Sequence, residues 1–456
     1  MRCRLFSFLA LFATFLAVGS AAAGRAAPPV RPNVLLIVAD DLGYGDLSCY
    51  GARDLRTPNI DALAADGIRF SRFYANSPVC SPTRSSLMTG CYPDRVGVPG
   101  VIRTFPSDNW GYLSPRIPLI PAVLKRAGYH TALVGKWHLG LASPNTPNER
   151  GFDLFHGFLG DMMDDYLTHR RHDINYMRRN DREIDPPGHA TDLFTGWATD
   201  YIESRAGQGK PFFLYLAYNA PHVPIQPPDS YVTRVRQRNP GIPDRRARLG
   251  ALIEQMDEGI GRVIDALKRT GAYGNTLIVF TSDNGGQLSA GASNGSLRGG
   301  KEDMYEGGIR EPMCAVWPGH IRGGSRSDRV ALAMDLFPTL CEAAGAKLAA
   351  RCDGVSILPD LTGAQRQDDR TLFWVRREGG ARYQGNAVYA ARRRDWKLVY
   401  NSPFEPLQLF NLLDDPEEKS DVARQNPKVF NELSAALREH IQAAGQVPWQ
   451  APATTR

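Results

Sequence analysis

The sequence predicts an α/β protein: a large, mostly parallel central sheet sandwiched by helices, followed by a smaller C-terminal α+β domain with an antiparallel sheet and a terminal helix. Its 456 residues are 43% hydrophobic and 22% charged, which is typical of a globular chain and excludes disordered, collagen-like and multi-span membrane classes. Strand-like apolar runs alternate with helix-like segments over most of the chain, and their unbroken hydrophobicity indicates strands buried on both faces. Near the C-terminus, shorter segments bounded by turns indicate antiparallel strands.

The N-terminus has the pattern of a secretory signal peptide. Arg2 and Arg4 precede an uncharged apolar stretch, residues 5–18, which small residues follow at positions 19–23. This order of basic, apolar and small residues predicts a signal peptide over residues 1–23. A membrane span needs about 20 apolar residues, so this run is too short for one, and no later segment approaches that length. We therefore expect export to the periplasm or the extracellular space, without a membrane span after the signal is removed.

Residues 31–361 are expected to form the α/β domain. Its strands are the apolar runs at residues 34–39, 131–134, 212–218, 277–281 and 313–316. Threonine or proline at the start and glycine at the end mark the boundaries of the intervening helices. The clearest are a helix with Thr57 as its N-cap, one at residues 118–127 and one at residues 246–269. Chemistry in such sheets gathers at the carboxyl ends of the strands, where we expect the functional residues.

Residues 362–456 are expected to form the C-terminal domain. Short strands are predicted at residues 389–391, 396–400 and 407–412, and an amphipathic helix at residues 429–444. The tail from Val447 is expected to fray, as chain ends commonly do.

Charge and cysteine content exclude two further classes of protein. The net charge is +6, but the 54 Lys and Arg residues are scattered among 48 acids, which argues against a nucleic-acid partner. The cysteines outside the predicted signal peptide are too few for a disulfide scaffold. They are Cys49, Cys80, Cys91, Cys314, Cys341 and Cys352. Cys341 and Cys352 are near enough in sequence to form a disulfide, although two free thiols suit the sequence equally well, and no pairing of the others is predicted.

Acidic and amide side chains follow two of the predicted strands. Asp40 and Asp41 end the first strand, and Asp283 and Asn284 follow the strand at residues 277–281. Two parallel strands that end in this way would bring three carboxylates and one amide oxygen around one hard cation, calcium or magnesium. The alternative is that Asp and Asn simply begin loops after strands, as they commonly do.

Cys80 begins a predicted helix in the sequence Cys80-Ser-Pro-Thr-Arg84. Pro82 suits the first turn of this helix, and Gly90 suits its end. Free N–H groups and the helix dipole would favour an anion beside Cys80, and Arg84 lies one turn further on the same face. Taken alone, however, a cysteine is more often a small buried apolar residue than a catalytic group.

With this complete Cys-x-Pro-x-Arg motif, the chain resembles type I, formylglycine-dependent sulfatases of the alkaline phosphatase superfamily, particularly arylsulfatases and N-acetylgalactosamine-6-sulfatases. The resemblance extends from about Pro32 to about Pro416. It implies an alkaline phosphatase-like fold and a sulfatase that removes sulfate from a carbohydrate or aryl ester. It also implies that a formylglycine-generating enzyme oxidises Cys80 to Cα-formylglycine (3-oxoalanine) during maturation.

The resemblance assigns roles to ten residues in separate parts of the chain. Besides Cys80, the implied catalytic residues are Arg84, His138 in Gly-Lys-Trp-His-Leu-Gly, and His222 in Ala-Pro-His-Val-Pro. Lys136 and Lys301 would bind the sulfate group. Calcium, rather than magnesium, would be held by Asp40, Asp41, Asp283 and Asn284.

The chemistry of sulfate esters explains why these groups belong together. The sulfur is shielded by anionic oxygens, which a divalent cation and three basic side chains would neutralise, leaving two positive charges over the three aspartates. One hydroxyl of the formylglycine hydrate would attack sulfur while His222 protonates the departing alcohol. His138 would then deprotonate the second hydroxyl, so that sulfate leaves by C–O cleavage.

Two rival functions remain open. Phosphonate monoester hydrolases and related phosphodiesterases resemble sulfatases and also use formylglycine. A non-catalytic binder of sulfated glycans would keep the pocket without oxidising Cys80. Considered individually, His138 and His222 each fit better as loop histidines whose hydrogen bonds are satisfied than as catalysts. In the same way, each of the two lysines alone fits better as a solvated surface charge.

Several polar clusters carry weaker indications. A basic cluster fits either contact with a polyanionic sugar chain or a solvated surface. It consists of Arg170, Arg171, His172, Arg178 and Arg179. The nearby Asp161, Asp164 and Asp165 fit either hydrogen bonds to sugar hydroxyls or a polar loop without a ligand. Residues 392–394 are three arginines that we expect to be surface charges, and the glycosylation sequon at Asn294 is expected to be incidental.

Overall fold

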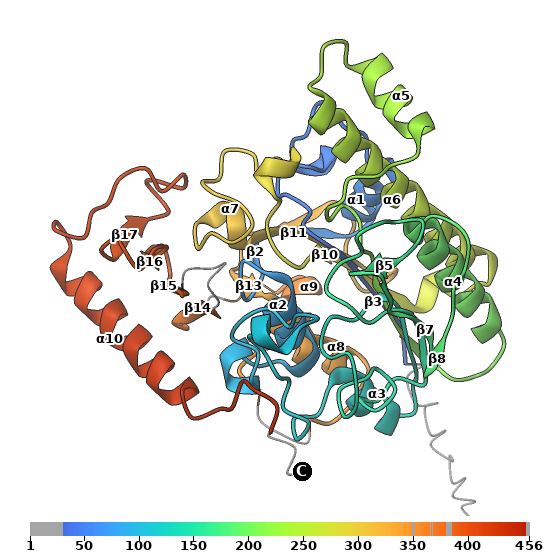
Figure 1. Ribbon diagram of the computed structural model, residues 1–456, viewed down its shortest axis with the longest axis horizontal. Coiled ribbons are helices and arrows are strands. Elements are labelled where there is room, and N and C mark those ends of the chain that lie inside the picture. Colours follow the sequence, from blue (N-terminus) through green and yellow to red (C-terminus); the bar gives the residue numbers. More distant parts are fainter. Residues whose placement is uncertain (1–30, 349–351, 365, 367, 380–384, 453–456) are drawn as a thin grey trace, which may run out of the picture. The chain divides into compact units, whose positions relative to one another are not determined.

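The computed structural model of the protein describes residues 31–348, 352–364, 366, 368–379 and 385–452 (Figure 1). The predicted signal peptide, residues 1–23, lies outside these residues. Within the described residues, no helix is both long and apolar enough to cross a membrane.

The largest element is an eleven-stranded sheet. Its strands are β1 (Asn33–Ala39), β2 (Ile68–Tyr74), β3 (His130–Lys136), β4 (Leu154–Phe158), β7 (Met177–Arg179), β8 (Arg182–Glu183), β9 (Phe212–Ala217), β10 (Thr276–Ser282), β11 (Arg310–Val316), β12 (Ser325–Ser327) and β13 (Ala331–Leu332). Their order is β12-β2-β11-β10-β1-β9-β3-β4-β7-β8, and β13 pairs with β2. The strands from β10 to β4 are parallel to one another, whereas β11 is antiparallel to both β10 and β2.

The predicted mostly parallel sheet is therefore confirmed, with antiparallel strands added on both sides. All five predicted runs are strands. The sequence did not predict β2 or β4, because Arg and Ser interrupt the apolar residues of β2, and β4 is short and contains His and Gly. Both strands are only partly buried, so they lack the continuous hydrophobicity that marks the central strands.

Helices cover both faces of this sheet (Figure 1). They are α1 (Pro58–Asp66), α2 (Cys80–Thr89), α3 (Ile120–Arg126), α4 (Ala190–Arg205), α5 (Asp229–Arg238), α6 (Asp244–Arg269), α7 (Glu306–Ile309), α8 (Leu336–Ala343) and α9 (Leu358–Leu361). Leu35 and Ile37 of β1 share a buried cluster with α1, α4 and α6, and the alternating Val34 and Leu36 share another with α2, α3 and α8. The predicted sandwich is confirmed.

The helix boundaries differ slightly from those predicted. Thr57 precedes α1 as expected, but its hydroxyl donates to Asp61 Oδ1 (3.1 Å) and does not cap the helix backbone. α3 begins two residues later than predicted, because Leu119 is extended and Pro121 occupies the first turn.

The C-terminal region contains an antiparallel sheet and a terminal helix, as predicted. The elements are β14 (Leu372–Glu378), β15 (Asn386–Arg393), β16 (Trp396–Tyr400), β17 (Gln408–Asn411) and α10 (Pro427–Ala444). The sheet has four strands, because β14 joins the three that the sequence predicted. One sheet face packs against residues of the larger part of the molecule, including Tyr74 and Met334, and the other packs against Leu433 and Leu437 of α10. A domain boundary after Leu361 stays a prediction. The two short strands β5 (Arg170–Arg171) and β6 (Ile174–Asn175) form a separate ribbon.

Some expectations for individual residues are wrong. Arg392 is only 2% exposed, and its guanidinium donates a hydrogen bond to the Tyr74 hydroxyl, so it is not a surface charge. The tail is not frayed at Trp449, which stacks on Trp110 with ring centroids 4.6 Å apart. Of the two alternatives left open for Cys341 and Cys352, the structure has the free thiols, as it has for all six cysteines among the described residues.

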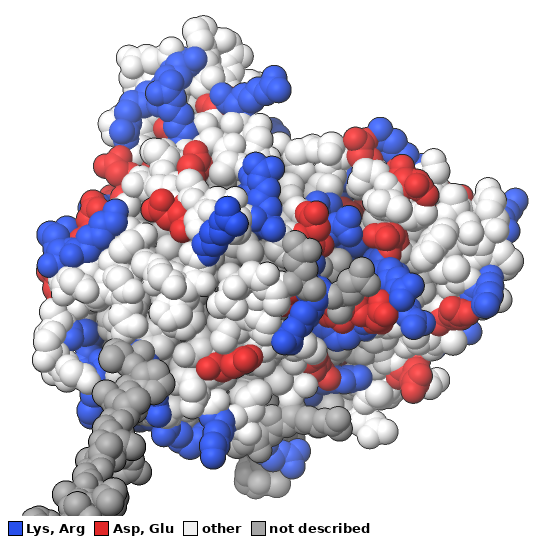
Figure 2. Space-filling view, turned by 180° about the vertical axis from the view of Figure 1, so that it is seen from behind, with Lys and Arg blue, Asp and Glu red and all other residues white. Residues whose placement is uncertain are grey.

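Two other expectations agree with the structure. Asn294 is buried and its amide donates to the Gly299 carbonyl (3.0 Å), which makes the sequon inaccessible. On the face shown in Figure 2, basic and acidic side chains lie interspersed, in keeping with the scattered charges of the sequence.

Candidate active site

The predicted metal ligands meet at the carboxyl ends of β1 and β10. These strands pair in parallel with Ala39 opposite Ser282, so the residues that follow them are neighbours. The Asp41 N–H donates to Asp283 Oδ1 (3.2 Å), and Asn284 Nδ2 donates to Asp41 Oδ1 (2.8 Å). All four predicted ligands, including Asp40, are buried.

Each aspartate of this group faces a basic side chain from another element. Lys136, at the end of β3, places Nζ 2.6 Å from Asp40 Oδ2. Lys301 places Nζ 2.7 Å from Asp41 Oδ2. In the same way, Nη2 of Arg84 lies 2.7 Å from Oδ2 of Asp283. The three positive and three negative charges cancel, so these side chains alone would not attract an anion.

Two buried oxygen atoms of the group have no hydrogen-bond partner among the described residues: Asp40 Oδ1 and Asn284 Oδ1. Asp40 Oδ1 lies 3.5 Å from Nη2 of Arg84, an ion pair without a hydrogen bond. Leaving such atoms without a hydrogen bond in a buried site is unfavourable, and a hard cation would satisfy them. Asp283 already accepts hydrogen bonds at both oxygens, from the Asp41 N–H and from Arg84. The residues present therefore fit a divalent cation bound through oxygen.

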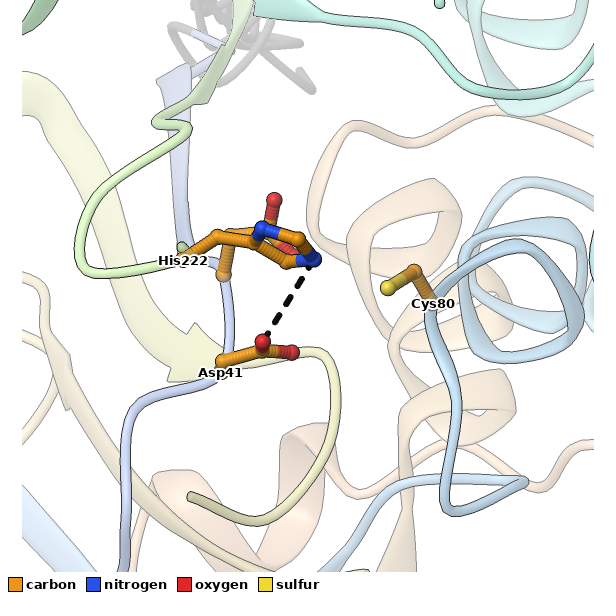
Figure 3. Close-up of side chains that lie close together, drawn as sticks. Asp41, Cys80 and His222 are labelled. Atoms are coloured by element: carbon orange, nitrogen blue, oxygen red, sulfur yellow. Dashed lines mark ion pairs between the residues drawn. The ribbon is translucent and has the colours of Figure 1, made fainter. Parts of the chain in front are cut away.

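A second arrangement of ligand atoms is also compact. Potential ligand atoms of Asp40, Asp41, Cys80 and His222 lie within 4.8 Å of one another. Figure 3 shows Cys80 and His222 pointing toward Asp41. This set replaces Asp283 and Asn284 by sulfur and nitrogen, which calcium and magnesium disfavour as ligands. We therefore take the oxygen donors as the cation site and the other two residues as its neighbours.

Cys80 is the first residue of α2, and it is buried. Val79 before it is extended, and Gly90 ends the helix with a φ of 71°, in the left-handed region that glycine tolerates. Burial raises the pKa of the Cys80 thiol well above its usual range, although Lys136 and Lys301 oppose the shift. The unmodified thiol is therefore poorly suited to act as a thiolate nucleophile.

His138 has one ring nitrogen free to accept a proton. Its Nε2 donates to the Ile102 carbonyl (2.8 Å), and its buried Nδ1 has no partner among the described residues. Burial lowers the pKa of His138 well below its usual value, and the charges of Lys136 and Arg84 lower it further. The ring is therefore neutral, with its lone pair on Nδ1.

His222 has the reverse arrangement of ring nitrogens. Its Nδ1 donates to the Val223 carbonyl (2.7 Å), which leaves Nε2 to accept from Lys301 Nζ (3.0 Å). Nε2 also lies 3.5 Å from Asp41 Oδ2. Burial lowers the pKa of His222, while the Asp41 charge raises it in part.

A cavity of about 570 Å³ opens above these residues. Cys80, His138, His222 and Lys301 line its deepest part, and we use the term base for these four residues together with the other six predicted site residues around them. The rest is lined by Val79, Val101, Arg103, Thr104, Phe105, Asp108, Asp161, Met162, Arg171, His172, Val223, Gln287, Leu288, Ser289, Gly300, Glu302 and Asp303. The structure thus brings all ten predicted site residues together, either on the cavity wall or in contact with it.

Most of the residues that line the cavity outside its base were not predicted from the sequence. Residues 101–108 come from a loop without a recognisable motif, and their position depends on contacts with distant segments. Of the predicted basic cluster, Arg171 and His172 line the cavity, whereas Arg170 pairs with Asp185 (2.7 Å) outside it. The Ile102 carbonyl that orients His138 carries no sequence signal, because every residue has such a group.

Two family models match the chain. The model described as Sulfatase covers residues 32–346, and the one described as N-sulphoglucosamine sulphohydrolase, C-terminal, covers residues 300–446. The first includes all ten site residues and more than half of the chain.

Individual proteins are also similar over most of their length. The N-acetylgalactosamine-6-sulfatase of Sus scrofa is 34% identical over 409 residues, which cover 84% of this chain and 74% of that protein. Arylsulfatase A of Homo sapiens is 35% identical over 468 residues, 91% of this chain and 89% of the relative. The crystal structure of Ps i-CgsB in complex with k-i-k-neocarrahexaose superposes with a TM-score of 0.84 at 34% identity, covering 93% of this chain and 96% of that one. The chain therefore belongs to the sulfatase family, and it is a type I sulfatase similar to the arylsulfatases and N-acetylgalactosamine-6-sulfatases.

Proposed function

We propose that this sulfatase hydrolyses a sulfate ester of a carbohydrate, of the N-acetylgalactosamine-6-sulfate type, or of an aryl alcohol, using a formylglycine made from Cys80 and one calcium ion. The observation that carries the proposal is the pair of unpartnered oxygens, Asp40 Oδ1 and Asn284 Oδ1, next to a cavity whose base contains Cys80, two histidines and a lysine. The names of the relatives and the oligosaccharide complex support a sulfated glycan as the substrate.

Calcium would be held by Asp40, Asp41, Asp283 and Asn284. When bound, the ion supplies positive charge to the sulfate oxygens and lowers the pKa of an oxygen nucleophile. An all-oxygen ligand set of this size suits calcium better than magnesium, which usually retains several waters. With the ion present, the base has a surplus of two positive charges over its aspartates, which favours an anionic substrate.

Formylglycine at position 80 would supply an oxygen nucleophile and a route for sulfate release that a thiol lacks. Without the modification, the side chain at position 80 would remain protonated, because burial raises the pKa of the Cys80 thiol. The complete motif from Cys80 to Arg84 supports a formylglycine-generating enzyme as the maturation partner.

The two histidines differ in the roles that their hydrogen bonds favour. His138 keeps a lone pair on Nδ1 at the cavity base, which suits a base that removes a proton from the nucleophilic residue. His222 directs Nε2 toward Lys301 and the cavity. To protonate the departing alcohol oxygen, Nε2 would first have to take up a proton, and Lys301 Nζ, which donates to it (3.0 Å), is the adjacent source. Lys136 and Lys301 would hold the sulfate oxygens.

The N-terminal pattern at residues 1–23 supports export of the enzyme to the periplasm or the extracellular space. Cell fractionation with an antibody against the full chain tests this, and retention of the protein in the cytoplasm would contradict it.

Sulfate release by the matured protein tests the proposed activity. The chain is coexpressed with a formylglycine-generating enzyme and assayed with p-nitrocatechol sulfate and a panel of sulfated sugars, with calcium present. We expect free sulfate, and a mass change in the Cys80 peptide that corresponds to conversion of thiol to aldehyde. Aryl phosphonate and phosphate diester serve as comparison substrates. No sulfate release, or faster turnover of the phosphorus compounds, would overturn the proposal.

A further inference from the structure

The mouth of the cavity has a charge balance opposite to that of its base. Among the described residues, the cations that line it beyond Lys301 are Arg103 and Arg171. The acids that line it are Asp108, Asp161, Glu302 and Asp303. The mouth therefore has two more carboxylates than cations, directly above a base that calcium would make positive.

Both arginines of the mouth are already bound to carboxylates. Arg171 Nε lies 3.0 Å from Asp161 Oδ1, and its Nη1 lies 2.7 Å from Asp164 Oδ1. Arg103 Nη2 lies 2.9 Å from Glu378 Oε2. Arg103 Nε also lies 3.8 Å from Asp108 Oδ2, and Glu302 Oε1 lies 3.3 Å from Nη2 of Arg376. A second sulfate or a carboxylate on the substrate would have to compete with these acids for the arginines, in a region where carboxylates outnumber cations. The mouth is therefore unsuited to a polyanionic ligand.

An exposed aromatic ring lies at the same mouth. Phe105 is 48% exposed, and its ring centroid lies 4.9 Å from that of His172. Leu288, which is 51% exposed, also lines the cavity. Exposed apolar side chains beside a concave polar site are typical of ligand contacts, and a phenyl face packs well against the C–H groups of a sugar ring.

The loop that carries Phe105 is fixed by contacts both before and after this residue. Before Phe105, the Ile102 N–H donates to Ser81 Oγ (3.1 Å) on α2. After it, Trp110 stacks on Trp449 of the C-terminal tail, with the two rings inclined by only 13°. Because the loop is positioned in advance, little conformational entropy would be lost when a ligand contacts Phe105.

We propose that Phe105 binds the sulfated ring of the substrate by stacking, and that the acidic mouth selects a ring whose only charge is the sulfate ester. The inference rests on the proposed function, because it takes the base to hold that sulfate. The substrate class is a neutral sugar unit with one sulfate, and not a disulfated or uronic-acid-containing unit. A cavity of about 570 Å³ is large enough for such a unit.

Kinetics on matched sugars test the selection. The matured wild type is assayed with monosulfated hexoses and N-acetylhexosamines, and the sugar hydrolysed fastest is compared with the same sugar carrying a second sulfate. We expect kcat/KM to be at least about tenfold higher for the monosulfate, since the second sulfate would face more carboxylates than cations at the mouth. Equal values would overturn the selection.

A double variant tests whether the acids cause this preference. Asp108→Asn with Glu302→Gln removes two negative charges from the mouth, keeps the side-chain shapes and removes the ion pairs of these acids with Arg103 and Arg376. The preference for the monosulfate is expected to fall by about threefold or more at low salt. An unchanged ratio would contradict the electrostatic part of the inference.

A second substitution tests the stacking residue. Phe105→Ala is expected to raise KM for the best sugar about tenfold, with kcat within about twofold, because it removes ground-state and transition-state binding equally. The inhibition constant of inorganic sulfate, which reports only on the base, should stay unchanged. Phe404→Ala is the matched control, since Phe404 is 80% exposed and does not line the cavity. An unchanged KM in Phe105→Ala, or the same change in both variants, would overturn the assignment.

The two proposals fail in different ways. If the matured protein hydrolyses no sulfate ester, the proposed function fails and this inference fails with it. If it hydrolyses monosulfated and disulfated sugars equally well and tolerates the loss of Phe105, the proposed function stands and only this inference is wrong.

Discussion

The base and the mouth of the cavity combine the same kinds of side chain in different ways. In the base, the three aspartates, Arg84 and Lys136 are buried and Lys301 is 14% exposed, and Asp40 Oδ1 and Asn284 Oδ1 accept no hydrogen bond from the described residues. In the mouth, Arg171 is partly exposed and binds two carboxylates. Buried ion pairs with an unsatisfied oxygen indicate a place for a ligand, whereas saturated pairs at the surface mainly hold loops in position.

Removal of the Cys80 side chain should give the largest effect in the base. Cys80→Ala is expected to lower sulfate release by about 10³-fold or more, because no other group replaces the nucleophile. The melting temperature should change little, since the buried volume lost is small. Cys91→Ser, at a half-buried cysteine outside the cavity, is the matched control. Residual activity near that of the wild type would contradict the assignment of position 80.

Substitution of His138 tests the second step of the proposed reaction, in which sulfate leaves residue 80. His138→Ala is expected to lower steady-state turnover about 10²-fold or more, which is the usual contribution of a general base. The first equivalent of alcohol should still be released rapidly, because His138 acts after the S–O bond breaks. Rapid-mixing measurements with p-nitrocatechol sulfate distinguish this from a general loss of activity. A uniformly slow first turnover would contradict the assigned step, and His320→Ala, at an exposed histidine, controls for the substitution itself.

Calcium should stabilise the folded protein through the two unpartnered oxygens. At a calcium concentration 100 times its dissociation constant, the free energy of unfolding should rise by about 2.7 kcal/mol. Thermal unfolding with calcium and with a chelator measures this difference. Asn284→Ala should abolish most of the response while Asn239→Ala, far from the cavity, retains it. A melting temperature that does not depend on calcium in the wild type would contradict the cation site.

Changes that loosen the mouth should have the smallest effect. Trp449→Ala removes the ring that stacks on Trp110 and is expected to cost about 1 kcal/mol, in line with measured aromatic pairs. KM for a sulfated sugar should rise a few-fold while the inhibition constant of inorganic sulfate stays constant. Melting curves and steady-state kinetics measure the two effects. A loss of activity as large as that of Cys80→Ala would remove the distinction between mouth and base.

Much of the central sheet could be predicted because its signal is local. The run from Val34 to Ala39 is buried on both faces, so its continuous hydrophobicity is visible in the sequence. β2 carries Arg and Ser at partly exposed positions and becomes a strand only through pairing with β11 and β12. The run of three arginines at 392–394 shows the same limit, because alternation along β15 turns Arg392 inward to Tyr74 while Arg393 stays exposed.

The candidate site was predicted more completely than the cavity around it. Motifs such as Cys80 to Arg84 combine residue types that the chemistry requires, so they can be recognised without knowing their neighbours. Phe105 and Glu302 have no such signature. Their place at the mouth follows from how the loop and the strands around them pack, and sequence reasoning did not find them.

By itself, the sequence determined the kind of sheet, the residues at the ends of its strands and the reactive groups of the base, because these depend on contiguous residues. The tertiary structure decided which distant residues pair, as when Lys301 meets Asp41 across 260 positions of the chain. It also decided the acidic, aromatic mouth. The physical reason is that long-range pairing and loop position depend on the packing of many segments together, and no single segment records the outcome.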